Sequence, residues 1–148
     1  MKILIDADGC PVVDITVGIA RKSHVECMIL CDTSHVFEKN GATTLTFSKG
    51  ADSVDFALVN RVSPDDIVIT QDYGLAAMCL AKSAVVINQD GMEYTSDNID
   101  ALLLARHTAK KIRSSGGRLK GPPKRVSAQN KEFEAALFRL LSARRDMQ

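Results

Sequence analysis

The chain has 148 residues, 45% of them hydrophobic and 25% charged, with a formal net charge of +1, a composition typical of a one-domain soluble protein. No apolar run approaches the ~20 residues that a membrane span needs, and the opening residues, one Lys followed by acids, do not form a secretory signal peptide. The four cysteines include no Cys-x-x-Cys pair, which argues against zinc sites and disulfide frameworks and favours a cytoplasmic protein with reduced thiols.

Short runs of β-branched and apolar residues alternate with segments of helical periodicity over the first 88 residues. The apolar runs predict strands at residues 2–6, 25–32, 42–48, 66–70 and 84–88. The segments between them predict helices at residues 12–22, 52–62 and 74–83. Pro11 is expected in the first turn of the first helix, where its missing N–H costs nothing. Strands that alternate with helices are typical of an α/β fold with a mostly parallel central sheet.

The last third of the chain is predicted to be helical around a basic linker. A long helix is expected over residues 96–115, with Ser96 or Asp97 as its cap. We divide the chain into an α/β domain (1–115), a linker rich in Gly, Pro and basic residues (116–128) and a C-terminal amphipathic helix (129–148). The apolar stripe of that helix is expected to pack on the same domain, and it consists of Phe133, Leu137, Leu140 and Leu141.

Charge is distributed unevenly along the chain. Residues 1–105 carry 7 Lys and Arg against 15 Asp and Glu, whereas residues 106–148 carry 12 against 3. An acidic body with a basic arm predicts an acidic site beside a surface for a polyanion. The alternative is that the basic segment serves solubility or folds back on the acidic body.

Acidic residues follow the predicted strands at the points where each strand ends. Asp6 and Asp8 follow the first strand, and Asp72 follows the fourth, while Asp52 and Asp55 begin the helix after the third. Ligands of open α/β sheets bind outside the carboxyl ends of the strands. If the first and fourth strands are neighbours, these acids converge on one corner of the molecule.

A cluster of carboxylates is suited to holding Mg²⁺ or Mn²⁺ for phosphoryl chemistry, since hard cations prefer oxygen ligands. Thr70 and Ser48, which also lie near strand ends, could position water or phosphate. Structural alternatives remain for some of these residues. Asp8 and Asp52 could cap the helices that follow them, and Ser48 could be an ordinary hydroxyl at a strand edge.

Five segments together resemble one known family: "IDADGCPV", "GADSVDFALV", "DIVITQDYGLAAM", "EYTSDNID" and "KGPPKR". They look like the YaiI/YqxD-type family of uncharacterised bacterial proteins, and the resemblance covers nearly the whole chain. That family is related to PIN-like domains, which are metal-dependent nucleases. The resemblance implies a PIN-like fold and a nuclease site made of Asp6, Asp55 and Asp72, supported by Asp8, Asp52 and Thr70. The segment after Asp72 lacks the further acid that a PIN-type site commonly has.

The basic residues of the last third are expected to bind the phosphates of nucleic acid, RNA rather than DNA, without reading its sequence. The predicted contacts are Arg106, Lys110, Lys111, Arg113, Lys120, Lys124 and Arg125. Tyr73 could stack on a base, His107 could extend the patch, and His35 could touch substrate from its loop. Cys10 is expected to be idle, because neighbouring carboxylates oppose a thiolate.

Two other functions are compatible with these residues. A non-catalytic RNA-binding protein with a PIN-like fold would also carry the basic residues, although 5% aromatic content without Trp offers few stacking platforms. The opening "LIDADGCPV" also resembles that of haloacid-dehalogenase-type phosphatases, whose first Asp is a nucleophile. That motif requires Thr after the Gly, where this chain has Cys10 and Pro11.

Overall fold

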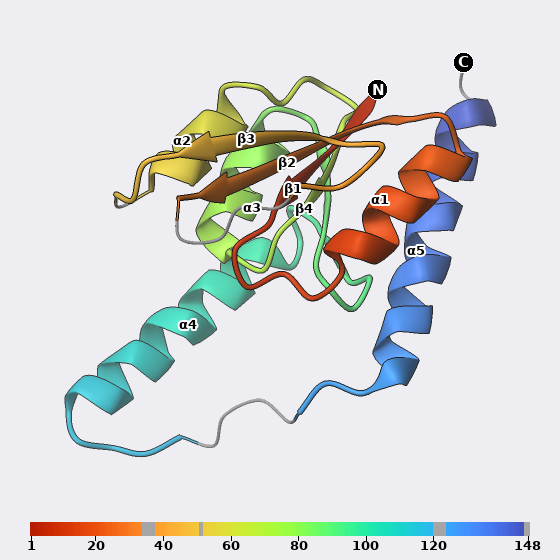
Figure 1. Ribbon diagram of the computed structural model, residues 1–148. Coiled ribbons are helices and arrows are strands. Elements are labelled where there is room, and N and C mark those ends of the chain that lie inside the picture. The colour runs from red at the N-terminus through yellow and green to blue at the C-terminus, as the bar shows by residue number, and fades with distance from the viewer. Residues whose placement is uncertain (34–37, 51, 120–123, 147–148) are drawn as a thin grey trace.

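The protein is built around a six-stranded sheet with the strand order β3-β2-β1-β4-β5-β6 (Figure 1). The computed structural model describes residues 1–33, 38–50, 52–119 and 124–146. Five strands are parallel, as predicted, and β6 pairs antiparallel with β5. The strands are β1 (Lys2–Asp6), β2 (Glu26–Asp32), β3 (Thr43–Phe47), β4 (Ile67–Ile69), β5 (Val85–Ile87) and β6 (Glu93–Tyr94). The sequence analysis missed β6, whose two residues are too few to show a periodicity.

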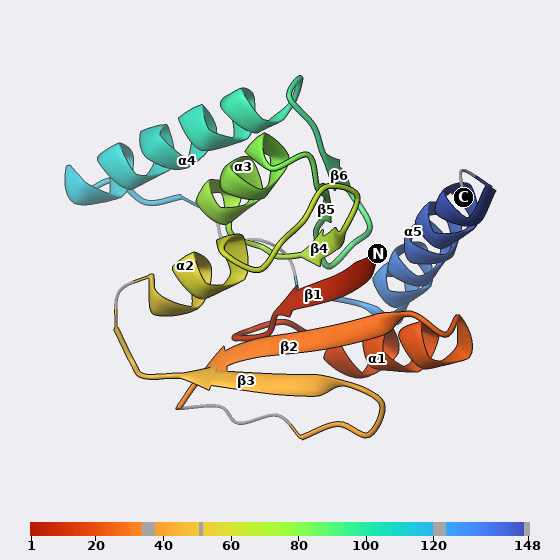
Figure 2. The ribbon, with the colours of Figure 1, turned by 90° about the horizontal axis from the view of Figure 1, so that it is seen from above.

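Helices cover both faces of the sheet (Figure 2). One face is covered by α1 (Val13–Lys22) and α5 (Ser127–Asp146), and the other by α2 (Ser53–Val59), α3 (Tyr73–Ala81) and α4 (Ile99–Ser114). The side chains of β1 alternate between these layers: Ile3 and Ile5 join the core under α1 and α5, and Leu4 joins the opposite core. Burial on both faces explains why this strand reads as a continuous apolar run.

Two predicted helix starts differ from the structure. Pro11 and Val12 precede α1, which begins at Val13. The residue before α4 is Asn98, so neither Ser96 nor Asp97 is the cap. Asn98 instead closes the preceding turn, because its Oδ1 accepts from the Thr95 N–H at 2.9 Å and its own N–H donates to Thr95 Oγ1 at 3.2 Å. Several polar residues precede this helix, and periodicity cannot choose among them.

The C-terminal helix packs on the same domain, as predicted from its apolar stripe. Phe133, Leu137 and Leu141 are buried against the sheet and α1, and Leu140 is partly buried beside them. None of the helices in the described part of the chain is long and apolar enough to cross a membrane. The neighbouring strands β1 and β4 lie where the strand order reverses direction, which brings the loops after them to one edge of the sheet.

Candidate active site at the carboxyl end of the sheet

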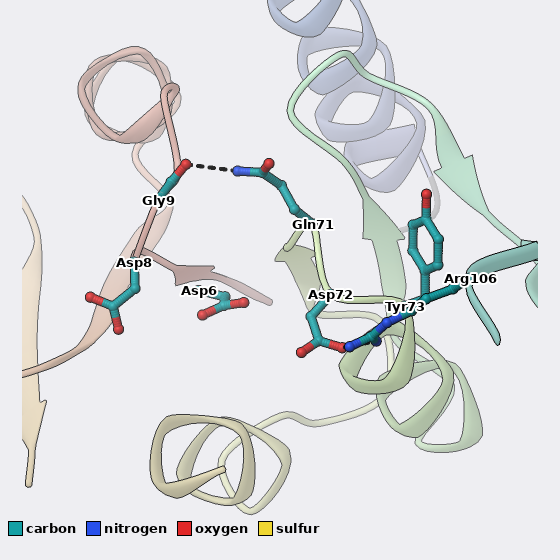
Figure 3. Close-up of a pocket in the computed structure, with 7 residues that line it drawn as sticks. All are labelled: Asp6, Asp8, Gly9, Gln71, Asp72, Tyr73 and Arg106. Atoms are coloured by element: carbon teal, nitrogen blue, oxygen red, sulfur yellow. Dashed lines mark hydrogen bonds and ion pairs between the residues drawn. The ribbon is translucent and has the colours of Figure 1, made fainter. Parts of the chain in front are cut away.

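A polar pocket of about 460 Å³ opens where the loops after β1 and β4 meet (Figure 3). The carboxylates of Asp6, Asp8 and Asp72 lie around it, and Arg106 of α4 reaches it from the side. Gln71 and Gly9 join its two loops, because Gln71 Nε2 donates to the Gly9 carbonyl oxygen at 2.8 Å. The structure thus brings together three of the five acids expected at the site, from two separate segments.

Thr70 links the two central acids. Its Oγ1 donates to Asp6 Oδ2 at 2.7 Å and accepts from the Asp72 backbone N–H at 3.0 Å. The Thr70 side chain is buried, with 1% of the residue exposed. Its hydroxyl therefore orients Asp6 and the start of the loop after β4, and it is not placed to meet water or phosphate itself.

Asp72 caps a helix through its side chain, whereas the two acids expected to cap helices make no such side-chain bond. Asp72 Oδ1 accepts from the Leu75 N–H at 3.2 Å at the start of α3. Asp8 Oδ2 accepts from the Asp32 N–H at 3.1 Å, which fastens the loop after β1 to the end of β2. Asp52 precedes α2 in the left-handed conformation (φ 65°) and forms no side-chain cap bond. Asp52 therefore occupies the N-cap position of α2, as the capping alternative predicts, but without a side-chain bond. Asp8 does not cap α1, because the residue before that helix is Val12.

The electrostatics of the pocket disfavour an uncompensated negative charge on Asp6. Burial raises the pKa of Asp6 from an ordinary 3.8 to about 6, although the hydrogen bond from Thr70 opposes this shift. The nearby negative charges, which also raise the pKa of Asp6, are those of Asp55, Asp72 and Asp8. A cation placed among these groups would remove the repulsion.

Asp55 lies in the first turn of α2, outside the residues that line the pocket. Burial raises the pKa of Asp55, and the charges of Asp72 and Asp52 raise it further. Because it acts electrostatically on both Asp6 and Asp72, Asp55 is close enough to belong to the same acidic region. Asp52 is exposed at the edge of this region.

The donor chemistry of the pocket fits a hard divalent cation, since its acids offer only oxygen ligands. Within the described residues, no group of three or more His, Cys, Asp or Glu side chains is arranged so that it could hold a metal ion. Mg²⁺ usually keeps several waters and uses one or two protein carboxylates together with substrate phosphates. The described residues therefore do not form a closed protein cage for a metal.

Two further residues define the side of the pocket next to α3 and α4. Arg106 Nη1 lies 3.7 Å from Asp72 Oδ1, and 60% of its side chain is exposed. Tyr73 packs edge-on against Tyr94, with ring centroids 6.0 Å apart, and its ring points away from the acids (Figure 3). The guanidinium is the positive group of the pocket, and a base would have to approach Tyr73 from outside the acidic cluster.

Only some residues of the predicted basic patch are exposed on the surface of the protein. Lys110, Lys111 and Arg113 are exposed on α4, and Lys124 is exposed before α5. Arg125 is half-buried, because it pairs with Asp90 and donates to the Gln89 carbonyl oxygen at 2.8 Å. Lys120 and His35 lie outside the described residues. Arg125 is thus engaged inside the protein, which spacing in the sequence could not indicate.

The other candidates from the sequence have little part in the pocket. Burial raises the pKa of the Cys10 thiol to about 11, so it is protonated at neutral pH, as expected for an idle cysteine. Ser48 is exposed just beyond β3, and His107 is exposed on α4. The sequence analysis missed Gln71 and Gly9. Gln71 carries no charge and belongs to no periodic pattern, although its position between Thr70 and Asp72 was a usable signal.

Comparison with known proteins identifies the family. The model of an uncharacterised bacterial family, YaiI/YqxD, matches residues 4–143. The chain is 52% identical to a UPF0178 protein of Exiguobacterium sibiricum over 146 residues, which cover 99% of this chain and 100% of the relative. It is 48% identical to one of Clostridium acetobutylicum, over 95% of this chain and 97% of the relative. No solved structure matches the chain. From the family match and these full-length relatives, the chain belongs to the YaiI/YqxD family.

Proposed function

We propose that this protein is a nuclease that hydrolyses phosphodiester bonds, chiefly those of RNA, with the help of Mg²⁺ or Mn²⁺. One observation carries the proposal. The carboxylates of Asp6, Asp8 and Asp72 face one open pocket at the carboxyl ends of β1 and β4, with a guanidinium beside them. The resemblance to PIN-like nucleases, which is itself a prediction, points to the same chemistry.

The residues of the pocket have distinct parts in this proposal. Asp6 and Asp72 would hold the cation, with Asp8 and Asp55 adding negative charge around it. A bound divalent ion supplies a water of lowered pKa and stabilises charge on the phosphate. Thr70 keeps Asp6 oriented through its 2.7 Å hydrogen bond. Arg106 would turn from Asp72 to a phosphate oxygen, because a guanidinium matches phosphate geometry well.

The decisive experiment measures cleavage of a fluorescent single-stranded RNA in Mn²⁺ and in EDTA. We expect Asp72→Asn to abolish cleavage and to leave RNA binding intact or tighter, because one negative charge is removed. The variant should fold, since Asn caps a helix as well as Asp does. Asp97→Asn is the matched control, because it removes an exposed acid outside the pocket. Full activity of Asp72→Asn, or activity that persists in EDTA, would contradict the proposal.

Metal binding is tested separately by thermal unfolding. Clustered acids repel one another, so a cation that binds the folded protein should raise the melting temperature. We expect millimolar Mn²⁺ or Mg²⁺ to raise it in the wild type and Asp6→Asn to weaken the effect. The same Asp97→Asn control should respond like the wild type. An unchanged melting temperature at millimolar Mn²⁺ would count against a metal site.

A second function, RNA binding without cleavage, is supported by the way Asp72 is engaged. Its Oδ1 accepts from the Leu75 N–H and lies 3.7 Å from Arg106, so capping and ion pairing already occupy this oxygen. If the protein only binds RNA, adding Mn²⁺ would neither cause RNA cleavage nor change the melting temperature of the protein. RNA would still bind with an affinity that falls as salt increases.

A further inference from the structure

A second cavity, of about 400 Å³, lies next to the acidic pocket. The two cavities share Gly9 and Gln71, whose 2.8 Å hydrogen bond forms the partition between them. The rest of its described lining is Pro11, Gln89 and Asp90 from the turn after β5, Arg125 just before α5, and Gln129 in the first turn of α5. We call it the amide pocket. Its volume lies within the ~300–1,000 Å³ usual for small-ligand sites.

The amide pocket is poorly suited to a second phosphate. Among the described residues that line it, the cation is Arg125, which is held by the Asp90 carboxylate through Nη1. Nη2 of the same guanidinium donates to the Gln89 carbonyl oxygen at 2.8 Å and to Asn130 Oδ1 at 2.7 Å. Asp90 balances the positive charge, so the cavity offers an anion no net attraction. What remains to recognise a ligand is a set of neutral amides.

Those amides have unused hydrogen-bonding groups within the described residues. Gln129 uses its Oε1 to accept from the Val126 N–H at 2.7 Å, and its NH₂ group makes no hydrogen bond. Gln71 uses its NH₂ group on Gly9, and its oxygen points away from that bond (Figure 3). Each amide therefore offers either a donor or an acceptor.

Two wall atoms lack any partner. Gln89 Oε1 and Arg125 Nε are inaccessible to solvent and form no hydrogen bond in the described part of the chain. An unpaired buried polar group destabilises the fold, and native proteins keep few of them. Both residues line the cavity, so a ligand that reached these atoms would supply the missing partner.

We propose that the amide pocket binds one nucleobase of the strand whose phosphate lies at the acidic pocket. The proposal rests on the nuclease function proposed above and adds a subsite to it. A free acceptor on one amide and a free donor on another match the edge of a base, which in adenine presents the N6 donor beside the N7 acceptor. The shared partition of Gly9 and Gln71 would place base and phosphate of one strand in adjoining cavities.

The test compares two fluorescent five-unit strands, oligo-adenylate and an abasic ribose-phosphate strand of equal length, by anisotropy in Mn²⁺. Every protein carries Asp72→Asn, so that neither strand is cut. The parent should bind oligo-adenylate roughly 5- to 30-fold more tightly than the abasic strand, as expected for hydrogen bonds worth about 1–2 kcal/mol. Adding Gln89→Leu should bring this ratio close to 1 without changing the affinity for the abasic strand.

Two further variants secure the interpretation. Gln89→Leu should melt at or above the parental temperature, because it removes an unpaired buried oxygen. Gln129→Leu should also lower the ratio, whereas Asn60→Leu, an exposed amide at the end of α2, should not. Equal affinity of the parent for both strands would overturn the proposal that the amide pocket binds a base, and would leave the nuclease proposal standing. Failure to bind either strand would overturn the nuclease proposal together with it.

Discussion

Individual aspartates in this protein have different roles, which depend on how deeply each is buried and on which groups it contacts. Asp66, 2% exposed, is satisfied at the amino end of β4 by Lys2 Nζ at 2.7 Å and by the backbone N–H of Ser63 at 2.8 Å. Asp6, at the carboxyl end of β1, receives a hydroxyl and faces other acids, and no basic side chain pairs with it among the described residues. In the first arrangement the carboxylate already has a cation and an N–H donor, whereas the second leaves a negative charge for a ligand to neutralise.

Asp6 should make stability depend on pH in a predictable direction. Its pKa in the folded protein, about 6, is above the ordinary 3.8, so folding is opposed by its ionisation. The wild type should therefore lose stability as pH rises from about 4 through 6, and the cost at pH 8 is about 1–3 kcal/mol. In EDTA, we expect Asp6→Asn to melt roughly 3–8 °C above the wild type at pH 8 and to match it near pH 4.

The control for this measurement is Asp97→Asn, which removes one exposed charge and should melt like the wild type at every pH. Calorimetry or circular dichroism at several pH values gives the comparison. If Asp6→Asn melted below the wild type at pH 8, its carboxylate would be stabilised by a partner and the acidic-pocket electrostatics would be wrong.

At the scale of elements, α4 is an unusual helix because little of it is buried. Ile99 in its first turn is buried, whereas Leu104 is 65% exposed, and the helix extends beyond the sheet (Figure 1). Its first half packs on α3 and carries Arg106 to the acidic pocket. The second half carries exposed basic residues. One helix therefore connects the proposed cleavage site with a basic surface.

Neutralising that surface should change the salt dependence of RNA binding. We expect the triple variant Lys110→Gln, Lys111→Gln, Arg113→Gln to bind any single-stranded RNA more weakly. Each lost phosphate contact should reduce the slope of log affinity against log salt by roughly 0.7. A salt titration of fluorescent RNA measures both quantities.

A matched triple variant has the same loss of charge on the opposite face of the sheet. It combines Lys22→Gln, Lys131→Gln and Arg139→Gln, all exposed on α1 or α5. It should retain the wild-type slope. Equal slopes for wild type and both triple variants would assign the basic segment to solubility.

For the whole molecule, α5 makes the last third of the chain part of the α/β domain. Gly91, in the turn between β5 and β6, has φ 86° and touches this helix closely. A Cβ at this position would lie 2.8 Å from Ala136 Cβ and 2.9 Å from the Glu132 carbonyl oxygen. The turn and the helix must therefore move apart if a larger residue is introduced.

We expect Gly91→Ala to destabilise the whole domain in a single cooperative transition, by about 2–3 kcal/mol or roughly 5–9 °C. Gly116→Ala is the control, because Gly116 has the same φ of 86° and, apart from its two chain neighbours, no described residue has an atom within 4 Å of an added Cβ. It should cost only the backbone strain, about 1 kcal/mol. A separate low-temperature transition in Gly91→Ala would mean that α5 unfolds independently.

The sequence alone determined most of the elements, β6 and the exact helix starts excepted, and the place of the acids after the strands. Burial on both faces makes a strand such as β1 continuously apolar, and an amphipathic stripe marks α5, so local patterns indicate both. The carboxyl ends of parallel strands share one edge, and this rule predicts that Asp6 and Asp72 approach each other. The pairing of β1 with β4 agrees with it.

Only the tertiary structure decided what each polar side chain contacts. Thr70 meets Asp6 across 64 residues, and Arg125 meets Asp90 across 35. No local periodicity encodes such pairs, because they depend on how two loops pack after the sheet has formed. For the same reason, spacing placed Arg125 in the basic patch and capping rules favoured Asp8 over Asp72. A hydrogen bond depends on distances of a few tenths of an ångström, which the fold sets and the residue pattern does not.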